Sequence, residues 1–271
     1  MTLSKKYLST VALALLCAAV FPSCKGDDKK DQPTPPAVEE KSLIASLTVT
    51  VENLSDPTRD YFYTIQYSYD AADRLSSATV SGDYNEDWSF TYGDGTITIA
   101  RNSDIEVFLT NANGYIVSDK TGDYSASYDA EGHLLQLHLG DDESRTFKWK
   151  GDLLTEAQYS YSRSNTSTNT TIIYSKTKDP TWGLITLGAL VSPETSMPAM
   201  WFGNTPACLP SKVIDHTTYS EQISEVTTTY NYTFDAKGRP VKIAGTSYEQ
   251  NKGKNPLPDC KVVVTFTITY K

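Results

Sequence analysis

Hydrophobic and polar positions alternate with a period of two through most of the chain after residue 44. In the segment YFYTIQYSY (61–69), four tyrosines and an isoleucine share one face, while Phe, Thr, Gln and Ser share the other. The segments VTTTYNYTF (226–234) and VVVTFTITY (262–270) repeat this pattern, with threonines opposite the larger residues. A helix could not gather these residues in one stripe, because its period is 3.6 residues. The alternation predicts antiparallel strands that are packed on one face and wet on the other.

Short turns that start with Asp separate these strands. Asp70, Asp129 and Asp235 each follow an aromatic residue and begin the segments DAADR, DAEGH and DAKGR. An Asp carboxylate can accept hydrogen bonds from the backbone that follows it, and the glycine can take a positive φ, a role that Asp73 fills in the first copy. Looser copies, TYGDGTITI, TNANGYIV and KWKGDLLTEA, recur at intervals of roughly 20 residues, which indicates one hairpin used repeatedly.

A single hairpin of this kind cannot bury its aromatic face. Burial of one Tyr or Phe side chain stabilises a fold by about 1.5–3 kcal/mol, and an isolated hairpin is only marginally stable in water. Hairpins placed side by side form a meander, and a twisted meander of ten or more strands tends to curl until its apolar faces meet. The predicted fold is therefore all-β, an antiparallel meander of repeated hairpins curled into a barrel-like sheet.

One segment departs from the strand pattern. DPTWGLITLGALVS (179–192) begins with an Asp at the N-cap and a Pro at the first helical position. Its apolar residues follow helical spacing, although Gly183 and Gly188 each weaken a helix by about 1 kcal/mol. We predict one short helix that plugs or covers an end of the sheet, and we expect the region from about 150 to 228 to interrupt the hairpin array.

The N-terminus carries an export signal. Lys5 and Lys6 precede an apolar run of 14 residues, too short for a membrane span, and the run ends in FPSC. A small residue before Cys24 resembles a bacterial lipobox, which implies cleavage after residue 23 and acylation of Cys24. Pro22 is not an ideal lipobox residue, so ordinary cleavage nearby remains an alternative. The predicted organisation is a signal peptide (1–23), a tether (24–43) and a single β domain (44–271).

The tether is charged and rich in proline, a composition that cannot bury enough surface to fold. It would hold the domain away from a membrane. Asp27 and Asp28, just behind Cys24, resemble the export signal of Bacteroidetes lipoproteins that reach the outer face of the outer membrane. We expect an outer-membrane, lipid-anchored and surface-exposed protein, with the periplasmic face as the alternative.

The net charge limits the classes of binding partner, and the cysteine content allows one disulfide. The chain has 24 Lys+Arg and 33 Asp+Glu; loss of the two lysines in residues 1–23 leaves 22 against 33, a net charge of −11. Such acidity argues against nucleic-acid binding, and it leaves the lipid anchor as the only membrane contact. Cys208 and Cys260 remain in the mature domain. A disulfide between them would stabilise the fold by about 4 kcal/mol, and two thiols are the alternative.

The repeats and the general layout resemble known families. YNYTFDAKGRP and YSYDAADRL are similar to the Tyr-x-Tyr-Asp-x-x-Gly-Arg-Leu motif of YD/RHS repeats. The lipobox, the acidic tether, the Asp-turn hairpins and a hydrophobic insert before FGNTPACLPSKV resemble a family of uncharacterised Bacteroidetes surface lipoproteins with a porin-like fold. The resemblance implies a single barrel-like sheet. It carries over no catalytic or binding residues.

The chain lacks the common sequence motifs for binding a cofactor or for catalysis. There is no Gly-x-Ser-x-Gly elbow, phosphate loop, dinucleotide fingerprint or His-Glu-x-x-His sequence. His133 and His138 lie near GDDES (140–144), where a metal could bind, but a solvated hairpin tip explains these acidic residues more simply. We therefore predict no metal, no cofactor and no enzyme. A glycan hydrolase stays an alternative, because its carboxylates are placed by the fold.

Aromatic residues on a sheet could stack on sugar rings. Trp88, Trp201, Tyr159 and Tyr161 are the candidate stacking residues, while the competing interpretation places such rows in the core. A membrane-spanning porin is disfavoured, because its lipid-facing row is apolar and its lumen polar, whereas here tyrosines dominate the apolar face. We expect a surface-tethered binding module, with glycans as the ligand class. A purely structural or adhesive lipoprotein is the alternative.

Overall fold

The computed structural model describes residues 43–102, 104–179, 181, 183, 186–187, 190, 201–219, 222–253 and 258–271. The predicted signal peptide, the tether up to residue 42 and most of the predicted helix at 179–192 lie outside these residues. Within the described ranges, no helix is long and apolar enough to cross a membrane.

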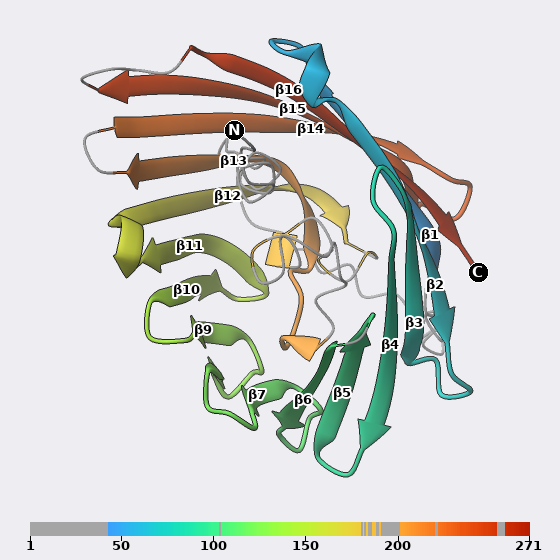
Figure 1. Cartoon of the computed structure of the whole chain (residues 1–271). Helices are drawn as coiled ribbons and strands as arrows, with labels where there is room; N and C mark the ends of the chain where they lie inside the picture. The colour runs from blue at the N-terminus through green and yellow to red at the C-terminus, as the bar shows by residue number, and fades with distance from the viewer. Residues whose placement is uncertain are drawn as a thin grey trace, which may run out of the picture.

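Sixteen antiparallel strands form one closed barrel in which each strand pairs with its neighbours in the sequence and β1 pairs with β16 (Figure 1). The strands are β1 Ile44–Asn53, β2 Tyr61–Tyr69, β3 Leu75–Gly82, β4 Glu86–Gly93, β5 Thr96–Arg101, β6 Asp104–Thr110, β7 Ile116–Asp119, β8 Tyr124–Tyr128, β9 Leu134–Leu139, β10 Glu143–Lys150, β11 Leu153–Tyr161, β12 Thr166–Lys178, β13 Cys208–Tyr219, β14 Gln222–Phe234, β15 Pro240–Gly253 and β16 Cys260–Tyr270. Short 3₁₀ turns occur at Pro57–Arg59 and Ser162–Ser164. The predicted all-β meander is confirmed, and it closes completely.

The apolar rows face the inside of the barrel. Along β2, Tyr63, Ile65 and Tyr67 are buried, whereas Phe62 on the opposite face is 47% exposed. Equivalent rows from all the longer strands join in one core cluster. The outward rows consist mainly of Thr, Ser, Asn, Gln and Lys, as in β14 and β10. The barrel is thus packed on its inner side and polar on its outer side.

The prediction that residues 150–228 interrupt the array was wrong in its extent. Strands β11, β12 and β13 and the first part of β14 occupy most of this region, so the insertion runs only from the end of β12 to Cys208. The Thr-rich segment forms strand β12, in keeping with the high β propensity of threonine. Its inner row of Thr170, Ile172 and Tyr174 still alternates. Two described residues of the insertion, Leu187 and Trp201, join the core cluster of the barrel.

No disulfide joins the two cysteines of the domain, in agreement with the two-thiol alternative. Cys260 pairs with Glu249, and Glu249 pairs with Val226. Val226 in turn pairs with Asp215, which lies seven residues beyond Cys208 on β13. The sulfurs are therefore separated by about 23 Å along the strand direction, far beyond the roughly 7 Å between Cα atoms that a disulfide can bridge.

The Asp turns adopt the predicted conformation. Asp70 Oδ1 accepts hydrogen bonds from the backbone N–H groups of Ala72 and Arg74, each at 2.9 Å. Asp235 repeats this arrangement in the turn between β14 and β15. Asp73 takes the left-handed conformation with φ of 57°, in the place where Gly238 has 77°. Since all such turns connect an even strand to an odd one, they gather at one rim of the barrel.

Candidate functional site

A ring of aromatic side chains follows the rim that carries the Asp turns. Near the end of an even strand, a Tyr hydroxyl or Trp indole N–H donates a hydrogen bond to a backbone carbonyl at the start of the preceding strand. The donor–acceptor pairs are Tyr69–Ile44 (2.8 Å), Tyr92–Leu75 (2.9 Å), Tyr128–Ile116 (2.6 Å), Trp149–Leu134 (2.8 Å), Tyr174–Leu154 (2.8 Å), Tyr232–Pro210 and Tyr270–Pro240 (2.9 Å). These donors satisfy carbonyls at the barrel end.

The last residue of a turn covers the next ring. Arg74 lies over Tyr92 at 4.3 Å, and Arg239 lies over Tyr270 at 4.3 Å. Arg74 also pairs with Asp70 (2.7 Å), and its backbone N–H and guanidinium hold the pKa of Asp70 below its ordinary value. His133 plays the same part on Trp149, with ring centroids 4.5 Å apart. At these three turns, the last turn residue therefore stacks on the aromatic ring of the next hairpin.

Strand β6 is the exception among the eight even strands. The segment TNANGYI (110–116) aligns with YDAADRL (69–75) and YDAEGHL (128–134), so Thr110 stands where the other copies have tyrosine. Its register confirms the alignment, because Thr110 pairs with Ile116 as Tyr69 pairs with Leu75. The preceding turn between β4 and β5 has two residues, against five between β2 and β3, and it lacks the covering Arg or His. Both members of one stacked pair are thus missing at the same place on the rim.

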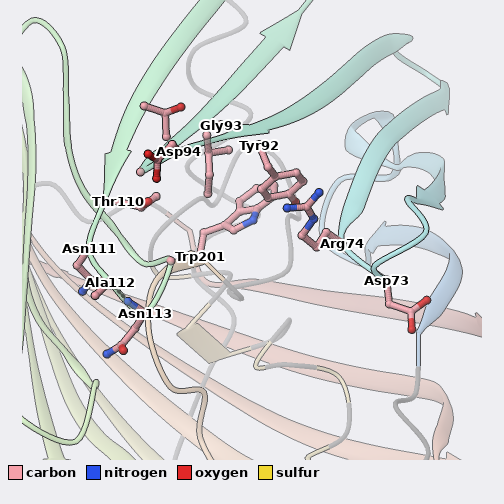
Figure 2. A pocket seen from close by; sticks show the side chains of 14 residues that line it. Asp73, Arg74, Tyr92, Gly93, Asp94, Thr110, Asn111, Ala112, Asn113 and Trp201 are labelled. Atoms are coloured by element: carbon pink, nitrogen blue, oxygen red, sulfur yellow. Dashed lines mark hydrogen bonds between the residues drawn. The ribbon is translucent and has the colours of Figure 1, made fainter.

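A cavity of about 660 Å³ opens at this gap. Its walls are three turns, β2–β3, β4–β5 and β6–β7, together with Trp201 from the insertion (Figure 2). Asp73, Asp94 and Asn113 line it, and their side chains make no hydrogen bond to another residue in the described ranges. Tyr92 contributes an aromatic edge. The cavity therefore offers carboxylate and amide groups beside an apolar surface.

The end of the insertion positions Trp201. Asn204 anchors this segment to the β8–β9 turn: its backbone N–H donates to the carbonyl of Gly132 (2.8 Å) and its side-chain amide donates to the carbonyl of Glu131 (2.6 Å). Trp201 then packs against Phe90 with centroids 4.9 Å apart, and its indole N–H donates to the Tyr92 hydroxyl. Only 5% of Trp201 is exposed. Trp201 therefore forms an inner wall of the cavity rather than an open platform.

The four predicted stacking residues do not form one site. Trp88 is held by Glu86, whose carboxylate accepts from the indole N–H at 2.9 Å, and by the guanidinium of Arg101 at 5.0 Å. Tyr159 lies under Arg145, and both Tyr159 and Tyr161 belong to the inner row of β11, seven strands away from β4. Of the four, Trp201 alone lines the rim cavity.

Sequence reasoning missed Asp73, Asp94 and Asn113 as cavity residues. They belong to turns, where polar residues are expected for conformational reasons alone. The available signal was the aligned repeat, in which Thr110 interrupts an aromatic column. The structural role of this aromatic position, which is to donate a hydrogen bond to a carbonyl of the preceding strand, is visible only in the folded barrel.

The other predicted polar candidates have structural partners. His133 is 4% exposed and bonds Asp129 through Nδ1 at 2.9 Å. At the GDDES tip, Asp142 binds Ser162 and Arg163, and Glu143 pairs with Arg145. In the part of the chain that the structure describes, no three His, Cys, Asp or Glu side chains form a group that could hold a metal ion.

Two carboxylates lie inside the barrel: Asp215 is buried and Asp179 is half-buried. Asp215, on the inner row of β13, accepts a hydrogen bond from the Thr170 hydroxyl at 2.5 Å, and burial raises its pKa to about 7. Asp179, at the start of the insertion, accepts from the backbone and hydroxyl of Thr181, and burial raises its pKa to about 6. Neither side chain lines the rim cavity.

Comparison with known proteins shows that the fold is similar to that of solved porin-like structures. No protein-family model and no curated protein matches the chain. The structure is similar to that of a porin-like protein from Bacteroides uniformis, with a TM-score of 0.61 and 18% identity over 83% of this chain and 98% of the other. A porin-like protein from Bacteroides vulgatus matches with a TM-score of 0.49 and 13% identity, over 85% and 99% of the two chains. The likeness to the Bacteroides uniformis protein confirms the porin-like fold that the resemblance implies.

Proposed function

We propose that this chain is a cell-envelope lipoprotein, acylated at Cys24, whose barrel is a binding module with the rim cavity as its binding site. A glycan is the ligand class that we propose, and binding takes place without catalysis. The observation that supports this proposal is the cavity at Thr110. There Asp73, Asp94 and Asn113, whose side chains form no hydrogen bond within the described ranges, line the same cavity as Tyr92 and Trp201. A repeat that served packing alone would gain stability from an aromatic residue at this position, as at the other seven strands.

The polar outer wall supports a barrel that does not span a membrane. Spanning barrels present an apolar band to lipid, and Lys or Arg at the bilayer midplane costs about 2–4 kcal/mol each. Here Lys148 and Lys150 belong to the outward row of β10, and Thr227 and Thr229 to that of β14. "Porin-like" accordingly describes the shape, and the attachment to the membrane is assigned to the acyl chain on Cys24.

The chemistry of the cavity supports a polar ligand such as a sugar. Its volume lies within the range of roughly 300–1,000 Å³ that is typical of small-molecule sites. Carboxylates of Asp73 and Asp94 accept hydrogen bonds, and the amide of Asn113 both donates and accepts, so together they match the hydroxyl groups of a sugar. Because little of Trp201 is exposed, these polar groups contribute more to recognition than stacking does.

Replacement of Thr110 by Tyr tests the proposal. The new side chain restores the missing member of the aromatic ring, so we expect it to fill the cavity while the melting temperature stays the same or rises. Native protein and a Thr110→Ser control, which keeps the cavity, should bind the same members of a soluble oligosaccharide panel on a glycan array, and Thr110→Tyr should not. Equal binding by Thr110→Tyr would place the site elsewhere, and no binding by the native protein would favour a purely structural role.

Localisation has its own test. If Cys24 is acylated, cells grown with labelled palmitate should incorporate the label into this protein. The Cys24→Ala variant should incorporate none. Surface exposure predicts that external protease degrades the domain on intact cells. Protection in intact cells combined with degradation after lysis would instead place the domain on the periplasmic side.

A further inference from the structure

The barrel wall is incompletely paired beside β6, at the end opposite the rim cavity. Strand β6 pairs with β5 from Asp104 to Leu109, but it pairs with β7 only from Phe108 to Thr110. Strand β7 has four residues, and a single residue pair joins it to β8. The first half of β6 therefore has an edge that no described strand covers.

Main-chain groups of two residues point toward this open side. The N–H of Thr110 donates to the carbonyl of Gly95, on the β5 side. Because backbone groups in an antiparallel strand alternate in direction, the residues at odd positions face away from β5. The N–H and C=O groups of Ile105 and the N–H group of Val107 therefore face the open edge, and none of these three groups bonds to another residue in the described part of the chain. The Val107 carbonyl faces Lys120, because the Phe108–Asp119 pair ends the β6–β7 ladder there.

A second cavity, of about 580 Å³, adjoins the edge. It is lined by β6, by the β7–β8 loop and by the start of β8. Ile105 on the outer row is 70% exposed. Three carboxylates, Glu106, Asp119 and Asp123, and one lysine, Lys120, line the cavity. The edge thus combines unpaired main-chain groups, an apolar outer row and a cavity lined by more acidic than basic side chains.

We propose that this edge binds an extended peptide strand in which apolar and basic residues alternate. Main-chain hydrogen bonds to Ile105 and Val107 would add the peptide to the sheet. Residues directly opposite each other in a pair of strands share one face. Apolar side chains of the peptide would therefore lie beside Ile105 and Val107, and its basic side chains beside Glu106. A second copy of this chain fits less well, because pairing of two β6 edges would bring the carboxylates of Asp104 and Glu106 together with their copies.

A proline substitution isolates the main-chain contribution. Val107→Pro removes an N–H that faces the open side and leaves the hydrogen bonds to β5 in place, and proline is tolerated in this position of an edge strand. The probe is a fluorescein-labelled peptide, acetyl-Lys-Val-Lys-Val-Lys-Val-amide, titrated against the full mature chain by fluorescence anisotropy. We expect saturable binding to the native protein and an affinity about fivefold to tenfold lower for Val107→Pro. Val107→Thr, which keeps the N–H, should bind within about twofold of the native protein.

Two further measurements keep the test decisive if Val107→Pro lowers the melting temperature. Ile105→Pro, nearer the start of the strand, should weaken binding in the same way. A peptide with N-methylated valines, which cannot donate, should bind weakly to the native protein. Equal binding by the N-methylated peptide would overturn the proposal, because it would show attraction by charge alone. Absence of saturable binding would also overturn it, as would native dimers that Val107→Pro dissociates.

Discussion

Tyr174→Phe measures what the aromatic ring contributes beyond packing. The Tyr174 hydroxyl donates to the carbonyl of Leu154 at 2.8 Å, and burial raises the pKa of this tyrosine well above its ordinary value. The substitution leaves the ring and its apolar contacts in place and removes only the hydroxyl. The loss of the bond leaves a buried carbonyl without that donor, which costs about 1–3 kcal/mol. We therefore expect the free energy of unfolding to fall by about 1–3 kcal/mol.

Equilibrium urea denaturation, followed by far-UV circular dichroism, is the assay, because a change in midpoint at constant slope reports stability alone. Tyr248→Phe is the matched control: its hydroxyl bonds Asp259 at 2.8 Å, but the residue is 44% exposed. Substitution at such a surface position should change stability by less than about 0.5 kcal/mol. Tyr128→Phe, whose hydroxyl bonds the Ile116 carbonyl at 2.6 Å, should behave like Tyr174→Phe. If Tyr174→Phe and Tyr128→Phe both match the Tyr248→Phe control, the hydroxyl–carbonyl bonds do not stabilise the rim and the reasoning is wrong.

Two further substitutions test the interior and the insertion. The pKa of Asp215 is about 7 in the folded protein against 3.8 for an ordinary Asp, so the folded state binds the proton more tightly and stability falls as the pH rises through this interval. Asp215→Asn should remove the slope between about pH 6 and 7, leave below pH 6 the part that Asp179 contributes, and raise stability at pH 8 by at most about 4 kcal/mol. The measurement is urea denaturation at several pH values, and an unchanged slope above pH 6 would show that Asp215 is not its source. Gly203→Ala would place a Cβ 2.3 Å from the Gly132 carbonyl oxygen at a φ of +94°. We expect a loss of about 1–3 kcal/mol and a red-shifted tryptophan emission as Trp201 leaves the core, whereas an unchanged spectrum would mean that this segment does not hold Trp201 in place.

Local features of the sequence determined the strands, their faces and their turns. The alternation in YFYTIQYSY identifies the buried row of β2 because side-chain direction in a strand depends only on the parity of the position. The conformation of the turn at Asp235 follows from a carboxylate and a glycine within five residues. These properties depend on neighbours in the chain, so they can be predicted without knowledge of the fold.

Long-range properties needed the tertiary structure. The pairing of Val49 with Phe266 closes the barrel, and nothing in either strand alone specifies the other as its partner. The separation of Cys208 from Cys260 follows from the register of four strands, and the reach of the insertion follows from where Asn204 finds the β8–β9 turn. The candidate site is of the same kind: Thr110 is an ordinary strand residue in the sequence, and it marks a cavity only because closure places it in a ring whose seven other members are aromatic. The sequence by itself thus determined the hairpin and its buried face, since these arise from contacts between near neighbours, whereas closure of the ring decided where the repeat leaves space for a ligand.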